Sequence, residues 1–282
     1  MIVSIGVLKI VIQEIEQDGG DMQVFIINLA SAGERRIFQQ QQMQRLSLCY
    51  QLLQATSVDD IPADTYQKHS LDWQRPLRKT EVACYFSHRD AWERVIQINQ
   101  PALILEDDAL LSKCVPELLA ALESREDADL INLEVRGRMK FVSKTSEKIT
   151  ADSRLYRLYQ DRAGAAGYII WPSGARKLLE YEQKKGIALA DAHITACSEM
   201  IAYQVEPAAI VQFDHGGQYG INIDRSDNIF VSTVSAANND KGGINFRFKR
   251  MLFQLKLGLR QLILITYAKR RYIKLKEDDF LQ

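Results

Sequence analysis

The sequence ALILEDD, residues Ala102–Asp108, joins a short apolar run directly to three carboxylates. A run of this length after a proline predicts a strand that is buried on both faces. In open α/β sheets, ligands bind at the carboxyl ends of the strands. Three adjacent carboxylates raise one another's pKa, so they are expected at an exposed tip or where a cation relieves their repulsion. We therefore expect the chemistry of this protein directly after this strand.

Segments that alternate between strand and helix patterns surround this stretch. Further strands are predicted at 24–29, 52–56, 129–133 and 168–171, and helices at 35–46, 80–98, 115–122 and 173–183. Thr80 is the expected N-cap of the second helix, and residues 61–79 are predicted to form a polar loop. The alternation predicts an α/β fold with a mixed central sheet flanked by helices.

The composition is that of a folded protein without a charge-driven partner. Of 282 residues, 46% are hydrophobic and 26% are charged, and the formal net charge is zero. A neutral chain has no general attraction to nucleic acid, so no nucleic-acid partner is predicted. The four cysteines are too widely separated to suggest a zinc site or a disulfide framework. We expect a cytoplasmic protein, because no signal peptide and no apolar stretch of about 20 residues is found.

The C-terminal part of the chain is strongly basic. Residues 241–276 contain eleven Lys and Arg and no Asp or Glu. From Phe248 onward apolar residues follow helical spacing, while Lys249, Lys256 and Arg260 fall on another face. Such a helix can lie in an anionic membrane surface, or it can pack on the core with its charges in water.

These features predict three parts of the chain. They are an N-terminal extension at 1–20, a core domain at 21–240, and a basic amphipathic helical tail at 241–282. A tail that binds the anionic inner membrane would make the protein peripheral on the cytoplasmic face of that membrane.

Three kinds of site share an apolar strand that ends in carboxylates. A phosphate-loop NTPase also needs GxxxxGK[ST], which the chain lacks. A response-regulator receiver needs a phosphate-accepting Asp after a later strand, whereas the next strand-like run here ends in Asn132-Leu133-Glu134. A glycosyltransferase uses an acid-x-acid motif to hold a divalent cation on the diphosphate of a nucleotide sugar. Glu106-x-Asp108 has this spacing.

The surroundings of this motif resemble glycosyltransferase family 25, the lipopolysaccharide galactosyltransferase-like family. Residues 25–29 (FIINL) and Glu34-Arg35-Arg36 look like its first strand and arginine pair. Residues 81–88 (EVACYFSH), followed by Trp92, are similar to its E-x-G-C-x-x-S-H helix, with Ala83 in place of the Gly. Residues 167–179 look like its strand-then-helix segment, and Asp191 falls where it has an acid, although without the usual preceding Pro. The resemblance covers roughly residues 24–226.

The resemblance implies a GT-A-like nucleotide-binding fold and a metal-dependent, inverting transferase. The expected reaction moves a hexose, galactose from UDP-galactose, to the oligosaccharide of lipopolysaccharide or lipooligosaccharide. Mn²⁺ or Mg²⁺ is the implied cofactor, with Asp108 and Glu106 as ligands and His215 as a further candidate ligand. Asp191 is the preferred base for the acceptor hydroxyl, and Glu134 and Asp214 are the other candidates. The candidate donor-binding residues are Asn28, Arg35, Arg36, Glu81, His88, Glu106 and Asp107.

Two other functions stay open at the level of sequence. One is a non-catalytic sugar-nucleotide-binding or membrane scaffold protein with the same fold, which would not turn over the donor. The other is a sugar-nucleotide hydrolase, which would form product without an acceptor sugar.

Overall fold

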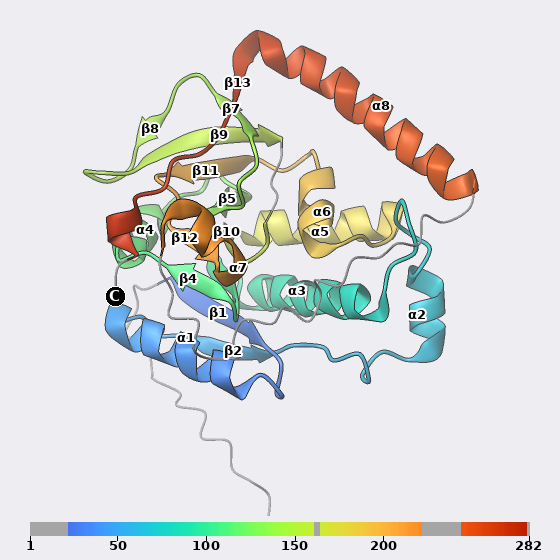
Figure 1. The fold of residues 1–282 in the computed structure, drawn as a ribbon, viewed down its shortest axis with the longest axis horizontal. Coiled ribbons are helices and arrows are strands. Elements are labelled where there is room, and N and C mark those ends of the chain that lie inside the picture. Colours follow the sequence, from blue (N-terminus) through green and yellow to red (C-terminus); the bar gives the residue numbers. More distant parts are fainter. Residues whose placement is uncertain (1–21, 161–163, 222–243, 281–282) are drawn as a thin grey trace, which may run out of the picture.

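The computed structural model describes residues 22–160, 164–221 and 244–280, in which helices flank a central sheet (Figure 1). The strands are β1 (Gln23–Asn28), β2 (Gln51–Gln54), β3 (Ala102–Glu106), β4 (Ala109–Leu111), β5 (Leu130–Asn132), β6 (Glu134–Val135), β7 (Lys140–Ser143), β8 (Glu147–Lys148), β9 (Arg154–Gln160), β10 (Gly167–Ile170), β11 (Ala202–Glu206), β12 (Ile210–Gln212) and β13 (Ala268–Arg271). The helices are α1 (Gly33–Leu46), α2 (Ala63–His69), α3 (Lys79–Ile98), α4 (Val115–Leu122), α5 (Pro172–Lys185), α6 (Ala190–Ala196), α7 (Phe213–Gly216) and α8 (Ile244–Tyr267), with short 3-10 turns at Gly217–Tyr219 and Glu277–Asp279.

The main sheet is mixed, as predicted. Within the described residues its strand order is β13-β7-β9-β11-β5-β10-β3-β1-β2, and β8 pairs with β9. β1 is parallel to β2 and β3, whereas β10 is antiparallel to both β3 and β5. β5 therefore runs in the same direction as β3. A second sheet, β4-β12-β6, starts directly after the acid cluster.

Strand β3 is buried on both faces, which confirms the prediction from its apolar run. Ala102 and Ile104 belong to a core shared with α3, α5 and α6. Leu103 and Leu105 belong to a second core shared with α1 and α4. Successive side chains of a strand point to opposite faces, so a continuous apolar run serves both cores. Burial of each large apolar side chain stabilises the fold by about 1.5–3 kcal/mol, which holds the acid cluster at a fixed place.

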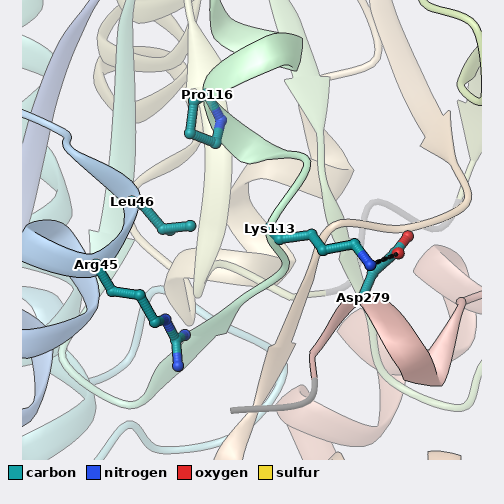
Figure 2. Close-up of a pocket in the computed structure, with 5 residues that line it drawn as sticks. All are labelled: Arg45, Leu46, Lys113, Pro116 and Asp279. Carbon is teal, nitrogen blue, oxygen red and sulfur yellow. Dashed lines mark ion pairs between the residues drawn. The ribbon is translucent and has the colours of Figure 1, made fainter.

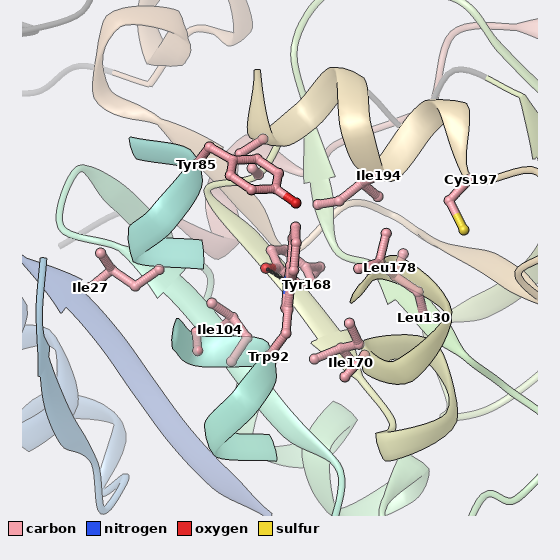
Figure 3. Packing of buried hydrophobic residues seen from close by; sticks show 14 of the residues in the cluster. Ile27, Tyr85, Trp92, Ile104, Leu130, Tyr168, Ile170, Leu178, Ile194 and Cys197 are labelled. Carbon is pink, nitrogen blue, oxygen red and sulfur yellow. Dashed lines mark hydrogen bonds between the residues drawn. The ribbon is translucent and has the colours of Figure 1, made fainter. Parts of the chain in front are cut away.

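Helix α3 and strand β10 bring the largest buried side chains to the first core. Tyr85, Trp92 and Tyr168 lie together there (Figure 3), each at most 1% exposed. The helix begins at Lys79 with Arg78 as its N-cap, so the prediction of Thr80 as the N-cap is wrong. The Arg78 backbone N–H donates to the Glu81 carboxylate at 2.9 Å, as in a capping box.

The segment 61–79 is not entirely loop, which corrects a second prediction. It contains the seven-residue helix α2. Tyr66 of this helix donates a hydrogen bond from its hydroxyl to the Leu77 carbonyl at 3.0 Å. Packing against the chain that follows, rather than a long periodic pattern, stabilises a helix this short.

The basic C-terminal segment is a helix followed by a strand, not a helix throughout. After α8, strand β13 pairs antiparallel with β7 at the sheet edge. Phe280 then packs with Leu110 and Val211 in a small core. The predicted boundary at residue 240 falls outside the described residues. Within the described ranges, no helix has the length and apolarity required to cross a membrane.

Candidate active site

Polar side chains gather at the edge of the sheet where β1, β3 and β5 end. These three strands run in the same direction. Their C-terminal ends therefore lie on one edge of the sheet and carry Asn28, the acid cluster Glu106–Asp108, and Glu134 just beyond β5. This is the edge at which open α/β sheets bind their ligands.

Asp107 faces helix α1 and holds the acid cluster to it. Asn28 Nδ2 donates to one carboxylate oxygen and Arg35 Nη1 to the other, both at 2.8 Å. Gln39 Nε2 also donates to the Asp107 carbonyl at 3.1 Å. Burial raises the pKa of Asp107, and the bonds from Arg35 and Asn28 oppose this rise. Two predicted donor-binding residues, Asn28 and Arg35, are thus joined through a third, Asp107.

Glu106 is held by a chain of hydrogen bonds that starts in the core. Trp92 Nε1 donates to the Tyr168 hydroxyl at 2.8 Å, and that hydroxyl lies 3.0 Å from His88 Nδ1. The His88 ring thus connects the Tyr168 hydroxyl, through Nδ1, with the acid cluster, through Nε2. His88 Nε2–H then donates to Glu106 Oε1 at 3.0 Å. Burial acts to raise the pKa of Glu106, but the bonds from His88 and Gln212 hold it below the ordinary value.

Gln212 joins Glu106 to Asp108. Its Nε2 lies 3.0 Å from Glu106 Oε2 and 3.4 Å from Asp108 Oδ1. A single neutral donor thus bridges two partly buried carboxylates. Burial, followed by the charge of Glu106, raises the pKa of Asp108 to about 7. This repulsion is what a divalent cation would relieve, and carboxylate oxygens suit Mn²⁺ and Mg²⁺.

Cys84 lies beside the same carboxylate. Its Sγ and ligand atoms of His88 and Glu106 all lie within 4.8 Å of one another, close enough to hold a metal ion. Burial and the surrounding carboxylates raise the pKa of the Cys84 thiol well above its usual value, so the thiol is neutral. Thiolate ligands favour Zn²⁺ rather than Mn²⁺ or Mg²⁺, and His88 Nε2 is already a donor to Glu106.

Glu134 is a fully buried carboxylate with one oxygen satisfied. Its Oε2 accepts a hydrogen bond from the Ala166 backbone N–H at 2.9 Å, whereas Oε1 accepts none from the described residues. Burial, opposed by nearby Arg136, raises the pKa of Glu134 to about 8. Gly164, at φ +97°, packs directly on this carboxylate, and a Cβ there would overlap it.

Arg136 lies between three residues that the sequence analysis selected. Its guanidinium is 3.9 Å from Glu134 Oε1, 3.7 Å from Asp191 Oδ2 and 3.4 Å from His215 Nε2. His215 Nε2 thus faces a donor rather than the acid cluster. Within the described residues, His215, Glu106 and Asp108 do not form a group of three ligands whose atoms all lie within 4.8 Å of one another. Its assignment as a metal ligand stays a prediction, as does that of Asp191 as the base.

Three other candidate residues lie apart from the acid cluster. Glu81 is buried and accepts two hydrogen bonds from Arg75, at 2.8 and 2.7 Å. Arg36 is exposed on α1, and Asp214 is exposed 3.7 Å from His215. Among the described residues, no hydrogen bond or ion pair joins any of the three to the acid cluster.

A small surface cavity lies elsewhere (Figure 2). Its volume is about 270 Å³, and its lining residues are Arg45, Leu46, Lys113, Pro116 and Asp279. Lys113 pairs with Asp279 at 3.1 Å, which ties the start of α4 to the C-terminal segment. None of the candidate site residues lines this cavity.

Sequence reasoning missed Arg136, Gln212 and Tyr168 as parts of the site. Arg136 lies only two positions beyond Glu134, and Gln212 lies three before His215. Both depend on the pairing of β6 with β12, which brings two distant segments together. In the sequence, these two residues could have been found only from their positions close to the candidate residues Glu134 and His215.

The fold and this site define an α/β protein with a carboxylate-rich centre at the C-terminal edge of its sheet. Residues 21–194 match the family model of glycosyltransferase family 25 (LPS biosynthesis protein). The chain belongs to this family of glycosyltransferases.

Relatives with related descriptions support this assignment. The lacto-N-neotetraose biosynthesis glycosyltransferase LgtE of Neisseria gonorrhoeae is 25% identical over 84% of this chain and 89% of its own. The lipooligosaccharide biosynthesis protein lic2B of Haemophilus influenzae is 25% identical over 67% of this chain and 75% of its own. Procollagen galactosyltransferase 1 of Danio rerio is 26% identical over 60% of this chain and 30% of its own. The match to another Haemophilus influenzae protein, named as a glycosyltransferase, spans 60% of that relative.

Proposed function

We propose that this protein transfers a hexose, galactose from UDP-galactose, to the oligosaccharide of lipooligosaccharide or lipopolysaccharide. Membership of family 25 supports the class of reaction, and the names of the relatives support the sugar and the acceptor. The observation that carries the proposal is the pair Glu106 and Asp108, bridged by one amide donor at the ligand-binding edge of the sheet.

Glu106 and Asp108 are the residues that would hold Mn²⁺ or Mg²⁺. Their chemistry fits, because both are partly buried carboxylates, and the neutral Gln212 amide that bridges them adds no positive charge between them. When bound, the cation neutralises charge on the diphosphate that leaves. His88 keeps Glu106 in a fixed orientation, and Asn28 and Arg35 do the same for Asp107 next to the donor.

The transfer needs a base on the acceptor side. In an inverting reaction the acceptor oxygen bonds to the anomeric carbon, the bond from that carbon to the phosphate oxygen breaks, and UDP leaves with the electron pair. The acceptor proton passes to a carboxylate. Asp191 suits this role better than Glu134, because its side chain is 27% exposed whereas that of Glu134 is fully buried.

We also propose that helix α8 binds the protein to the cytoplasmic face of the inner membrane. Its outer face carries a stripe of exposed apolar residues: Phe248, Met251, Leu252, Leu255, Leu259, Leu262 and Ile263, each 48–66% exposed. Residues 241–276 carry eleven basic and no acidic side chains. An anionic lipid surface is the partner that this combination fits, at about 1 kcal/mol per basic residue near the surface.

One experiment tests the reaction. Purified protein is incubated with a panel of UDP-hexoses, with Mn²⁺ or with chelator, and UDP release is measured with and without a lactosyl or glucosyl acceptor. Metal-dependent release that rises with acceptor is the expected result. Equal release without acceptor would identify a hydrolase. Tight UDP binding without release from any donor would identify a binding protein.

A further inference from the structure

Arg136 is a cation among acidic side chains, and none of the described residues holds it through a short, paired hydrogen bond. Four acids, Glu134, Asp191, Glu106 and Asp214, favour its charge, and together they outweigh the burial that opposes it, so its pKa is raised. Yet its nearest carboxylate oxygens lie 3.7 and 3.9 Å away, beyond hydrogen-bond distance. Its one hydrogen bond to a described residue is the 3.4 Å contact with His215 Nε2.

Other arginines of the described residues are held differently. Arg35 donates to Asp107 at 2.8 Å, and Arg75 donates to both oxygens of Glu81 at 2.8 and 2.7 Å. A guanidinium reaches its full strength through such short, paired bonds to an anion. Arg136 has the charge and the donors for these bonds but does not use them within the described residues. Its side chain is 31% exposed, so a ligand can reach it.

A second observation points to the same place. Glu134 is fully buried, and its Oε1 faces Arg136 without accepting a hydrogen bond from a described residue. Arg136 and Glu134 are therefore close to each other but do not form a hydrogen bond. An arrangement of this kind is typical of a site whose polar groups are completed by a ligand.

The position of Arg136 indicates which part of a bound ligand it would contact. It follows β6, whose neighbour β12 ends in Gln212, the residue that bridges Glu106 and Asp108. On the other side it lies next to Asp191, the proposed base. Arg136 is therefore between the proposed metal ligands and the proposed acceptor side, where the bond that breaks would lie.

We propose that Arg136 binds the diphosphate of the nucleotide-sugar donor and stabilises the charge on the UDP that leaves. The inference rests on the proposed function. The two arginines among the candidate donor-binding residues, Arg35 and Arg36, fit this role less well, because Arg35 is bonded to Asp107 and Arg36 is on the exposed surface of α1. Paired N–H groups make arginine the residue best suited to a diphosphate.

The test is a series of ligands that differ only in phosphate. Binding of uridine, UMP and UDP is measured by calorimetry with Mn²⁺ for the wild type, Arg136→Gln, Arg136→Lys and Arg138→Gln. Arg138 is the matched control, an exposed arginine two residues further along. Thermal melting of each variant checks that it folds. If Arg136→Gln does not fold, Arg136→Lys, which keeps the charge, still tests the inference.

The expected result is a loss that depends on phosphate. Arg136→Gln should weaken UDP binding by roughly tenfold to a hundredfold, since bonds between charged groups are involved. Uridine binding should be unchanged, Arg136→Lys should be intermediate, and Arg138→Gln should bind UDP like the wild type.

Other outcomes overturn the inference. An equal loss for uridine and UDP would show a general effect on the pocket. Unchanged UDP affinity with a lower kcat would show that Arg136 positions Asp191 instead. If the wild type bound neither UMP nor UDP, the proposed function itself would fail. The inference alone fails if the wild type binds UDP and the Arg136 variants bind it equally well.

Discussion

Glu106 and Asp108 have the same chemistry but opposite pKa directions, because their hydrogen bonds differ. Glu106 accepts bonds from His88 and Gln212, which hold its pKa below the ordinary value despite burial. Among the described residues, the Asp108 carboxylate has only the longer contact with Gln212, and burial next to Glu106 raises its pKa to about 7. The less compensated carboxylate of the pair is therefore the one that gains most from a cation.

Asp108→Asn should abolish metal-dependent transfer while the protein stays folded. The change removes a ligand charge without changing volume, so we expect at least a hundredfold loss of UDP release. The melting temperature without metal should not fall, because repulsion with Glu106 is removed. Calorimetry with Mn²⁺ checks the loss of binding, and Asp59→Asn at an exposed position is the control. Near-normal activity would contradict the metal assignment.

Gly164→Ala should damage the site through Glu134. Gly164 has φ +97°, and an added Cβ would overlap the Glu134 carboxylate. A side chain in this conformation costs about 1–3 kcal/mol. We expect lower stability in urea denaturation and lower transferase activity.

Gly258→Ala is the matched control for that change. Gly258 lies in α8 with nothing within 4 Å of an added Cβ. The substitution should raise stability by up to about 1 kcal/mol through helix propensity. If the two variants had the same stability and the same activity, the contact of Gly164 with Glu134 would contribute nothing to the site.

At the scale of elements, apolar patterning predicted the strands that are buried on both faces. The runs at 24–29, 102–105, 129–133 and 168–171 correspond to β1, β3, β5 and β10. Among the strands that were missed, β7, β9 and β13 lie toward the other edge of the sheet and mix charged and apolar residues. The short strands β4, β6, β8 and β12, and β11 next to β5, were missed as well. The sequences of such strands resemble those of loops, because their pairing depends on distant partners and not on a local run of apolar residues.

Only part of the candidate site was predictable, because only part of it follows a local sequence pattern. Glu106–Asp108 directly follow the strongest strand, so their position could be read from the sequence. The contact of Arg136 with Asp191 joins residues that are far apart in the chain, on a loop after β6 and on α6. No spacing pattern records such a contact, because only the folded packing of β6 near α6 creates it.

Glu206 joins β11 to the C-terminal segment and should make this junction sensitive to acid. Its carboxylate accepts bonds from the Arg271 guanidinium and from the Lys274 backbone N–H. Burial acts to raise its pKa, but these bonds leave it lowered. A lowered carboxylate pKa stabilises the fold above the unfolded-state pKa, and this contribution is lost as pH falls through the folded-state value.

Glu206→Gln should therefore reduce stability at pH 7 by about 1–3 kcal/mol, because a buried charged partner of Arg271 is removed. Between about pH 5 and pH 3 the variant should lose less stability than the wild type, so the two curves converge. Urea denaturation at several pH values measures this. Glu199→Gln, at an exposed position, should follow the wild type throughout. Parallel curves for Glu206→Gln would contradict the assignment.

At the scale of the whole molecule, α8 has two faces with different tasks. Its inner face holds it to the body, where Lys249 and Arg260 donate to the carbonyls of Leu71 and Tyr159. Phe253 contacts the Trp73 ring with centroids 5.6 Å apart. Two basic residues that the sequence assigned either to a membrane surface or to water thus hold the helix to the rest of the protein. Helix α8 lies along the outside of the molecule (Figure 1), and its other face carries the exposed apolar stripe that we propose binds a membrane.

The double variant Leu255→Glu, Leu259→Glu should therefore lose membrane binding without loss of folding. Both leucines are more than half exposed, so the core is unaffected. The glutamates remove apolar area and add repulsion from anionic lipid, and vesicle binding should fall at least tenfold. Sedimentation with phosphatidylglycerol vesicles, compared with neutral phosphatidylcholine vesicles, measures this, and Ile201→Glu is a control at an exposed position outside α8. Wild-type binding to anionic vesicles should weaken with salt. If gel filtration instead showed a wild-type dimer that the double variant abolishes, the stripe would be covered by a second copy of the chain and the membrane proposal would fail.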